Sequence, residues 1–325
     1  MDALSDALRG FRFSGAIFLD AELTRPWAVV TPSSADIADA LAVRADHVIP
    51  YHLVTEGECT VTIPGQAPVR LTGGEIVMIP HGNVHTLASQ VDVPPIQLPR
   101  EFVDSVLKRR SILPIRHGGG GGTTRMLCGF FAVDRWYAQH LVKGLPPLVS
   151  AHVGSDGGQQ LLAAVARRSI EESKAGGPGS DALVCRLSEV LFLDALRLIV
   201  KDAQVPVMGW LAGLRDPHIR HALSLIHARS QQQWSIQTLA NDCGMSRSSF
   251  VEKFSALIGS PPMKYLAQWR MTLAARDLSE RDTTVMEVAD RYGYSSEASF
   301  TRAFRRAFNI PPATFRRSQL RNRDQ

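Results

Sequence analysis

The sequence predicts a two-domain protein, with a small β-barrel, a helical linker and an all-α domain that contains two helix-turn-helix units. Two domains are the expected number for 325 residues. Residues 1–100 alternate short β-branched runs with Pro and Gly, which is typical of strands and turns. From about Gly158 the apolar residues follow a helical period, and near the C-terminus one pattern occurs twice.

These observations also predict where the parts begin and end. We expect the β domain over residues 1–157 and the helical linker, a candidate dimerisation segment, over 158–216. The helix-turn-helix domain is expected over 217–317, and residues 318–325 form a tail.

Within the β domain, several short runs have strand composition. They include Trp27–Val30, Cys59–Ile63 and Glu75–Ile79, and a last β segment is expected over Arg125–Val133. Residues 92–117 are rich in Pro and end in a basic cluster, so they predict a loop-rich excursion from the barrel.

Five consecutive glycines, Gly118–Gly122, precede the last β segment. A phosphate-binding loop needs a strand before the glycines and a helix after them, with Gly-Lys-Ser/Thr at the junction. Neither that context nor that tripeptide follows here. The glycine run therefore predicts a flexible loop rather than a phosphate site.

The linker predicts two helices separated by a Gly/Pro break over Lys174–Ser180. The second helix is apolar over most of its circumference, which is more than a surface helix needs. It is expected either to pack on the β domain or to meet a second chain, and residues 201–216 then form a connection. The apolar positions of the first helix are Leu161, Leu162, Val165 and Ile170.

The first copy of the repeated pattern, residues 235–258, reads as a helix-turn-helix. Ser235 is placed to cap a helix that ends near Gly244, where the chain must turn sharply and glycine tolerates positive φ. Ser246 then caps a second helix, whose Phe250, Phe254 and Leu257 share one face. That apolar face is expected to be buried.

The second copy, residues 284–308, follows the same plan. Thr284 and Glu287 form a capping box, Gly293 is the turn, and Ser295 or Ser296 caps the second helix. The offset between copies is 49 residues up to the serine and 50 after it. We place the extra residue between the capping serine and the first buried phenylalanine. The inward residues are Phe300, Phe304 and Phe308.

An amphipathic helix over Met263–Ser279 joins the two copies and can hold them at a fixed spacing. Its candidate core residues are Leu266, Trp269, Leu273 and Leu278. If both second helices point the same way, they can enter successive major grooves, roughly 34 Å apart. The alternative is a purely structural role, in which the two copies are only packed helical hairpins.

Charge favours DNA binding over that alternative. The chain carries 36 Lys and Arg against 31 Asp and Glu, a net charge of +5. Residues 211–325 hold 17 basic and 10 acidic residues, so the excess of positive charge lies in the segment with the repeat. A basic C-terminal part and a near-neutral N-terminal part are typical of a protein whose C-terminal domain binds nucleic acid.

The segment from about His218 to Arg317 resembles the DNA-binding domain of the AraC/XylS family of bacterial transcription regulators. The match includes the specific signature region of the family, with one departure at Asn309, where the family usually has Gly. Asn tolerates the left-handed conformation better than most residues. The matching signature residues are Ala289, Gly293, Tyr294, Phe300, Phe304, Pro312, Phe315 and Arg316.

This resemblance implies DNA contacts on the outer faces of the two second helices. Arg302 is suited to guanine and Glu252 to the amino group of cytosine. Arg305 and Arg306 are expected near phosphates, with solvated helix-face charges as the alternative. Residues implied to approach bases are Ser248, Val251, Glu252, Glu297, Ala298, Thr301 and Arg302, and Arg247 and Lys253 are implied to lie near phosphates.

The N-terminal domain resembles a cupin β-barrel. Gly74 to His85 fits the pattern G-x5-P-x-G-x2-H of the second cupin motif, and Tyr51 to Gly57 resembles the end of the first motif. A small jelly-roll barrel is the fold that this resemblance implies. The whole chain is then similar to AraC-type regulators whose sensory domain is a cupin.

Metal-binding cupins use an H-x-H pair and a Glu in the first motif and a His in the second. His85 matches the second motif, but the H-x-H is absent, because His47 and His52 are five residues apart. His52 and His85 can still meet inside the barrel, with Cys128 or His152 nearby. We favour hydrogen-bonded histidines, either in the barrel lumen or in a small-molecule pocket, over a metal site, and we predict no cofactor.

Composition excludes several other classes. The four cysteines, Cys59, Cys128, Cys185 and Cys243, are scattered without a CxxC pair, so neither a zinc finger nor a disulfide framework is expected. There is no apolar run of transmembrane length and no signal-peptide pattern, which predicts a cytoplasmic protein without membrane contact.

We therefore predict a transcription regulator, an activator or a repressor, that binds promoter DNA and is controlled by an unknown small-molecule effector at the barrel. RNA polymerase is a candidate partner, and a homodimer through the 158–200 helices is expected. One alternative is a metal-dependent cupin enzyme fused to DNA-binding helices. Another is a DNA-binding protein whose barrel serves only oligomerisation.

Overall fold

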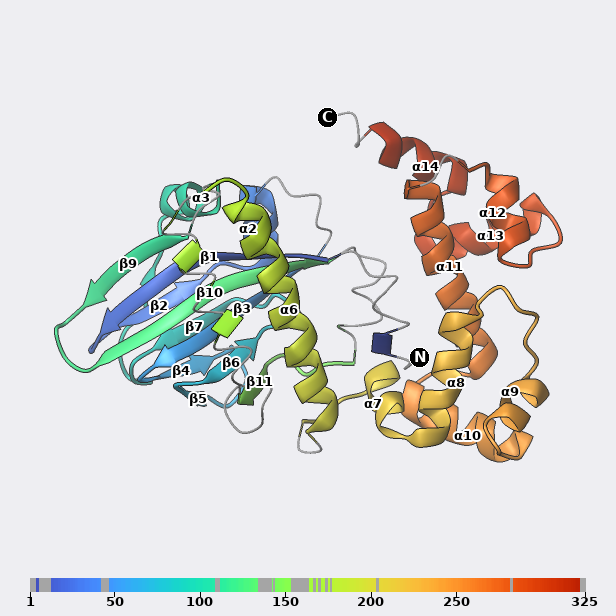
Figure 1. The fold of residues 1–325 in the computed structure, drawn as a ribbon, viewed down its shortest axis with the longest axis horizontal. Coiled ribbons are helices and arrows are strands. Elements are labelled where there is room, and N and C mark those ends of the chain that lie inside the picture. The colour runs from blue at the N-terminus through green and yellow to red at the C-terminus, as the bar shows by residue number, and fades with distance from the viewer. Residues whose placement is uncertain are drawn as a thin grey trace. The chain divides into compact units, whose positions relative to one another are not determined.

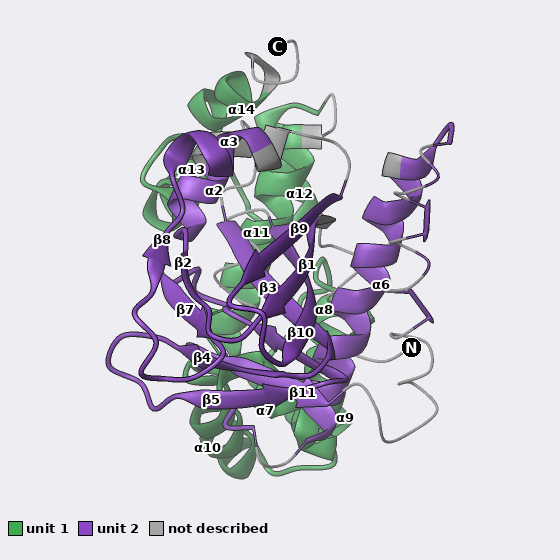
Figure 2. Cartoon of the chain, turned by 90° about the vertical axis from the view of Figure 1, so that its left-hand side faces the viewer, with its two compact units in different colours: residues 1–11, 139–144, 208–325 green, residues 12–138, 145–207 purple. Residues whose placement is uncertain are grey.

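The computed structural model describes residues 13–41, 47–108, 112–133, 144–152, 177–202, 205–280 and 283–321, together with the short pieces 4–5, 142, 164–165, 168, 171–172 and 175. The chain forms two compact units, shown in different colours in Figure 2. One unit comprises residues 12–138 and 145–207, and the other comprises 1–11, 139–144 and 208–325.

The unit of residues 12–138 and 145–207 is built from two facing β-sheets (Figure 1). One sheet has the strand order β11 (Val149–His152), β6 (Glu75–Met78), β3 (His47–Glu56), β10 (Thr123–Val133), β1 (Phe13–Thr24) and β9 (Leu113–Gly118). The other has the order β5 (Val69–Thr72), β4 (Glu58–Thr62), β7 (His85–Ala88), β2 (Ala28–Thr31) and β8 (Ile96–Gln97). This two-sheet arrangement confirms the predicted cupin-like jelly roll.

The core of this unit lies between the sheets. Leu23 of β1 and Met126 of β10 meet Val61, Leu71 and Leu87 of the opposite sheet, and all are buried. Side chains alternate between the two faces of a strand, so Ala21 and Leu23 of β1 and Met126 and Cys128 of β10 all join this layer. The inner layer also bounds the cavity described below.

The outer face of the six-stranded sheet is covered by α6 (Ser180–Lys201) (Figure 1). Phe192 of α6 packs on Phe131 of β10, with ring centroids 4.7 Å apart, and Phe131 stacks on Tyr51 of β3 at 4.3 Å. Of the two predicted partners for this apolar helix, the structure therefore shows the β domain. Three residues of the predicted first linker helix, Leu161, Leu162 and Ile170, lie outside the described residues.

Residues 92–117 were wrongly predicted as a loop-rich excursion. They contain β8, the helix α3 (Arg100–Lys108) and most of β9. The strand β9 pairs in parallel with β1, and β8 pairs in parallel with β2. Both strands are short and lie at sheet edges, so their pairing depends on distant residues and leaves little trace in local composition. The helix α2 (Ser34–Leu41), which packs against α3, was also missed.

The glycine run is a packed turn and not the free loop that was predicted. Gly119 N–H donates to the Thr24 carbonyl at 2.9 Å, and Gly121 N–H donates to the Arg25 carbonyl at 2.9 Å. A Cβ atom on Gly118 would lie 1.9 Å from the Thr24 carbonyl oxygen. These glycines let two backbones approach closely where β9 turns into β10.

The described part of the other unit is all α (Figure 1). The helix α11 contacts α10, α12, α13 and α14 and so lies at the centre of the unit. The segment 209–215, predicted as part of a connection, forms α7 and buries Trp210, Leu211 and Leu214. The helices are α7 (Gly209–Arg215), α8 (Pro217–Ala228), α9 (Ile236–Asp242), α10 (Arg247–Ile258), α11 (Pro262–Glu280), α12 (Val285–Arg291), α13 (Glu297–Phe308) and α14 (Pro312–Arg321).

No helix in the described part of the chain combines the length and the apolar character needed to cross a bilayer.

Candidate DNA interface and barrel cavity

The first helix-turn-helix, α9 and α10, has the caps that the sequence predicts. The Ser235 side chain accepts from Thr238 N–H at 3.1 Å, and Ser246 accepts from Ser249 N–H at 3.2 Å. Gly244 lies between the helices with φ of 66°, a backbone region that favours glycine. These local bonds fix where each helix begins and how sharply the chain turns.

The second helix-turn-helix, α12 and α13, is built in the same way. Thr284 N–H donates to the Glu287 carboxylate at 2.7 Å, and Glu287 N–H donates back to the Thr284 hydroxyl at 3.2 Å. Gly293 has φ of 77°, and Ser296, rather than Ser295, caps α13. Our placement of the extra residue was therefore wrong: it lies in the turn before the cap, and both recognition helices run for 12 residues.

The inner faces of α10 and α13 are buried as predicted, with two exceptions, Leu257 and Phe308. Phe308 is half-buried and packs against Phe304 and Phe315. Phe250 and Phe254 of α10, and Phe300 and Phe304 of α13, are fully buried. Leu257 is only half-buried, and its neighbour Ile258 takes the core position at the end of α10. Because these apolar residues lie on one face of each helix, the opposite face points toward solvent.

A buried carboxylate that sequence reasoning missed joins α12 to α11. Asp277 of α11 accepts from Arg291 Nη1 at 2.6 Å and from Tyr292 Oη at 3.0 Å. The side chain of Asp277 is 2% exposed, so this pair is shielded from water and from salt. An acidic residue on the apolar face of α11, between Ala274 and Leu278, is the signal that could have revealed it.

Arg270, also on α11, has a similar role toward the first helix-turn-helix. Its Nε donates to the Ser230 carbonyl at 2.8 Å, and its Nη2 donates to the Gln232 carbonyl at 2.8 Å. These carbonyls belong to the loop between α8 and α9. The helix α11 thus holds both helix-turn-helix units through specific polar contacts as well as through its core.

On the outer face of α10, the candidate contact residues differ in accessibility. Arg247, Ser248 and Glu252 are exposed, whereas Val251 and Lys253 are half-buried. Lys253 Nζ lies 2.6 Å from the carboxylate of Asp216, which caps α8. The Lys253 charge is therefore already paired within the protein, and the pair lowers the pKa of Asp216 against the opposing effect of burial.

The outer face of α13 carries more free positive charge. Glu297, Ala298, Arg302, Arg305 and Arg306 are exposed, and Thr301 is half-buried. The structure therefore places all candidates of α13 on one accessible side, as a helix that enters a groove requires. The left-handed residue Asn309, with φ of 61°, ends this helix as the sequence predicts.

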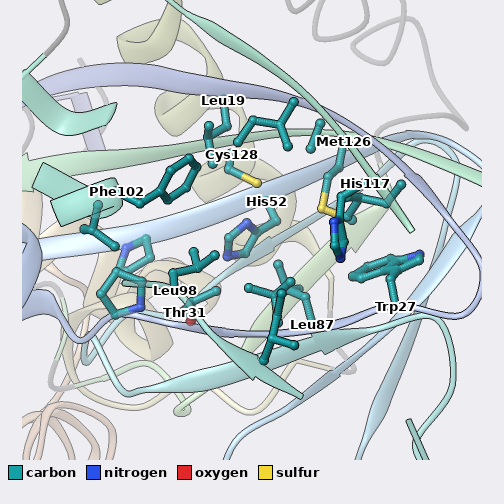
Figure 3. A pocket seen from close by; sticks show the side chains of 18 of the residues that line it. Leu19, Trp27, Thr31, His52, Leu87, Leu98, Phe102, His117, Met126 and Cys128 are labelled. Carbon is teal, nitrogen blue, oxygen red and sulfur yellow. The ribbon is translucent and has the colours of Figure 1, made fainter. Parts of the chain in front are cut away.

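The barrel encloses a cavity of about 360 Å³ between the two sheets (Figure 3). Its wall is almost entirely apolar and combines residues of both sheets, α2 and α3. Phe102 of α3 and Arg116 and His117 of β9 contribute to it, although these segments gave no signal in the sequence. Other lining residues include Leu19, Leu23, Trp27, Ile37, Leu87, Leu98, Met126 and Cys128.

His52 and His85 meet at the cavity wall, as the sequence predicts. Their Nε2 atoms lie 2.7 Å apart, and His85 Nδ1 lies 2.9 Å from the Asn83 carbonyl oxygen. Burial lowers the pKa of His85 to about 4. Burial also lowers the pKa of His52 well below its usual value, with the neighbouring His85 contributing. Both rings are therefore neutral near pH 7.

The predicted neighbours of this pair differ in position. Cys128 lies opposite His52 on the adjacent strand and lines the cavity, and burial raises the pKa of its thiol. His152 is instead exposed at the end of β11, beside Gly74. Among the described residues, no three His, Cys, Asp or Glu side chains lie close enough together to hold a metal ion.

Comparisons with known proteins cover both units. Residues 2–201 match the Cupin family model, and residues 239–318 match the Helix-turn-helix domain family model. An AraC-like transcription regulator of Streptomyces lividans is 30% identical over 280 residues, which cover 85% of this chain and 90% of the relative. The HTH-type transcriptional regulator AlkR of Acinetobacter baylyi is 26% identical and covers 97% of this chain and 99% of its own length.

A solved structure is also similar to the C-terminal part. The DNA-binding domain of the global transcriptional factor AdpA, in complex with a target DNA, is 33% identical and has a TM-score of 0.32. The match covers 34% of this chain and 98% of that domain.

Proposed function

We propose that an effector in the barrel cavity controls how the two helix-turn-helix units bind a promoter. This chain belongs to the AraC-like transcription regulators. The protein is a DNA-binding transcription regulator, and its relatives are regulators rather than enzymes. The alternative of a metal-dependent cupin enzyme is therefore set aside.

The observation that carries the proposal for DNA is the pair of matched, outward-facing helices on one rigid helix. The helix α11 has 19 residues, which corresponds to a length of about 28 Å. Successive major grooves on one side of a duplex are roughly 34 Å apart. A helix of this length can hold α10 and α13 at the spacing that two neighbouring grooves require.

The residues that we assign to DNA are the candidates on the outer faces of these two helices. We assign base contacts to Ser248, Val251 and Glu252 on α10 and to Glu297, Ala298, Thr301 and Arg302 on α13. We assign phosphate contacts to Arg247, Lys253, Arg305 and Arg306. Because the outer residues of the two helices differ, each chain is expected to recognise a non-palindromic site.

Control by an effector is supported by the cavity of about 360 Å³, which is within the usual size range of small-molecule sites. An effector changes DNA binding only if it has different affinities for two conformations of the protein. In this proposal residues 1–157 are the sensory domain, 158–216 the linker and 217–317 the DNA-binding domain. The effector-independent alternative, in which the barrel only oligomerises, predicts identical DNA binding with and without any cavity ligand.

The proposed partners are promoter DNA, RNA polymerase and a second copy of the chain. Its place of action is the bacterial cytoplasm, where the promoter lies. The candidate dimer contact lies in residues 158–200, and the outer side of α6 away from the sheet remains available in the described part of that segment. Sedimentation of the full chain at tens of micromolar distinguishes a dimer from a monomer.

Arg302→Ala tests the DNA assignment. The full chain with this substitution should bind its selected DNA site more weakly by about 1–3 kcal/mol. On a panel of single-base variants of that site, it should lose its preference at one base pair. Arg305→Ala is the matched control on the same helix and should weaken all sites equally. If Arg302→Ala also weakened every site equally, its assignment as a base contact would be wrong.

A further inference from the structure

The cavity opens at the free edges of the two sheets. The strand β8 is the last strand of one sheet and β9 is the last strand of the other. The exposed lining residues, Ile96, Pro99, Arg116 and His117, lie on these strands or just before α3. Phe102 and Val103 of α3 line the cavity, and Val103 packs on the apolar cluster that contains Ile37 of α2. A ligand can therefore enter at this edge, beside α3.

The size and the wall of the cavity restrict what can enter. A volume of about 360 Å³ holds on the order of a dozen water-sized groups, at roughly 30 Å³ each. Aliphatic, aromatic and sulfur-containing side chains dominate the wall, including Leu23, Trp27, Leu87 and Met126. The guanidinium of Arg116 is a permanent charge in the wall, and its side chain is 84% exposed near Glu22. The buried part of the cavity is thus suited to an uncharged, apolar body.

The hydrogen bonds of the two histidines fix which nitrogen carries each proton. A carbonyl oxygen only accepts, so His85 Nδ1 donates to the Asn83 carbonyl. In a neutral ring His85 Nε2 then lacks a proton and accepts, so His52 Nε2 is the donor across the 2.7 Å contact. The remaining nitrogen, His52 Nδ1, therefore carries a lone pair and no proton.

That lone pair is buried and unpaired. His52 is 4% exposed, and its Nδ1 has no hydrogen-bond partner within the described ranges. Figure 3 shows the His52 ring among the side chains that line the cavity, and Cys128 lies beside it on the paired strand. An unpaired buried acceptor costs about 1–3 kcal/mol, which a ligand that supplies a donor can recover.

We propose that the barrel cavity selects an uncharged, mainly apolar compound of about a dozen nonhydrogen atoms that carries one hydroxyl or N–H group, which donates to His52 Nδ1. This inference rests on the proposed function in one respect, because it takes the cavity to be the effector site. A carboxylate is disfavoured at this position, because the neutral pair offers no buried cation to balance its charge.

Three related compounds test the proposal with the full chain. The probes are 2-naphthol, which has a hydroxyl donor, 2-methoxynaphthalene, which has no donor, and 2-naphthoate, which is an anion at pH 7. Calorimetric titration should give a dissociation constant about tenfold lower for 2-naphthol than for 2-methoxynaphthalene. The anion should bind more weakly than either.

His52→Phe keeps a ring of similar size and removes the acceptor. It should bring the dissociation constants of 2-naphthol and 2-methoxynaphthalene together. The control His152→Phe, at an exposed position at the end of β11 and outside the cavity wall, should keep the tenfold ratio. Equal binding of both compounds by the natural chain overturns the proposal, and so does the absence of binding by all three probes. Because those two outcomes come from the unmodified chain, they hold even if His52→Phe does not fold.

Failure of this inference is distinguishable from failure of the proposed function. The ligand class is tested by the ratio of two dissociation constants that are measured without DNA. The proposed function depends on the affinity for a selected DNA site and on its change when a cavity ligand is present.

Discussion

At the scale of single residues, His52 and His85 form a buried pair in the barrel. Their Nε2 atoms lie 2.7 Å apart, and burial lowers the pKa of both rings, so both are neutral near pH 7.

The two histidines make the stability of the barrel depend on pH. The pKa of His85 is about 4 in the folded protein and near 6.5 when unfolded, so the unfolded chain binds more protons between these values. The stabilisation is complete above about pH 6.5. The free energy of unfolding should fall by on the order of 1–3 kcal/mol as the pH drops toward 4. His52 adds a loss in the same direction.

Urea unfolding of the full chain between pH 4 and pH 7.5 measures this effect. Comparison with His85→Gln, which has no imidazole at that position, isolates the contribution of His85. The difference between the two proteins should shrink with falling pH. A constant difference over the whole range would show that His85 is not buried in its neutral form.

Single residues were predictable from the sequence where they depend on local bonds. Ser235, Ser246 and Thr284 cap their helices as expected, because a cap involves only the next three residues. The resemblance to cupin motifs allowed His52 and His85 to meet, and the structure brings them together. Asp277 was missed, because its partners lie 14 and 15 residues away along the chain.

At the scale of elements, helix positions in the C-terminal domain were predictable and edge strands in the barrel were not. The helices α10 and α13 combine caps, turn glycines and an apolar face, all of which are local signals. The strand β8 has two residues and β9 pairs with β1 from a distance of many residues, so neither has a pattern of its own. The side of α6 that packs on the sheet could not be chosen from the sequence, because an apolar helix face fits either a sheet or a second chain.

The two recognition helices should contribute unequally to the salt dependence of DNA binding. Lys253 of α10 is paired with Asp216, whereas Arg305 and Arg306 of α13 are exposed. Each phosphate contact that is lost lowers the slope of log affinity against log salt by about 0.9. The double variant Arg305→Ala/Arg306→Ala should lower the slope by about two, and Lys253→Ala by less than one. A larger change for Lys253→Ala than for the double variant would contradict this assignment.

The contact between α11 and α12 should be a stability determinant of the second helix-turn-helix. Asp277→Ala removes the acceptor of Arg291 and Tyr292 and should cost about 2–3 kcal/mol, below the usual 3–5 kcal/mol because Arg291 can reach water. Asp242→Ala, at an exposed position, is the matched control. Thermal unfolding of the full chain checks the difference. Equal midpoints for the two variants would mean that the Asp277 network contributes nothing.

At the scale of the whole molecule, the sequence predicted the fold class and the type of protein, and these are confirmed. It did so because the repeated pattern and the second cupin motif are specific over short stretches. The shape and wall of the cavity were not predictable, since they combine residues from β1, β8, β9 and α3 that only the folded barrel brings together.

We propose that one chain recognises two different stretches of DNA in successive major grooves. Base-protection footprinting on a site selected from random DNA is the sharpest test, with the number of chains per site measured in parallel. We predict two clusters of protected bases per chain, about one helical turn apart and unlike in sequence. Protection confined to a single major groove per chain would contradict the account.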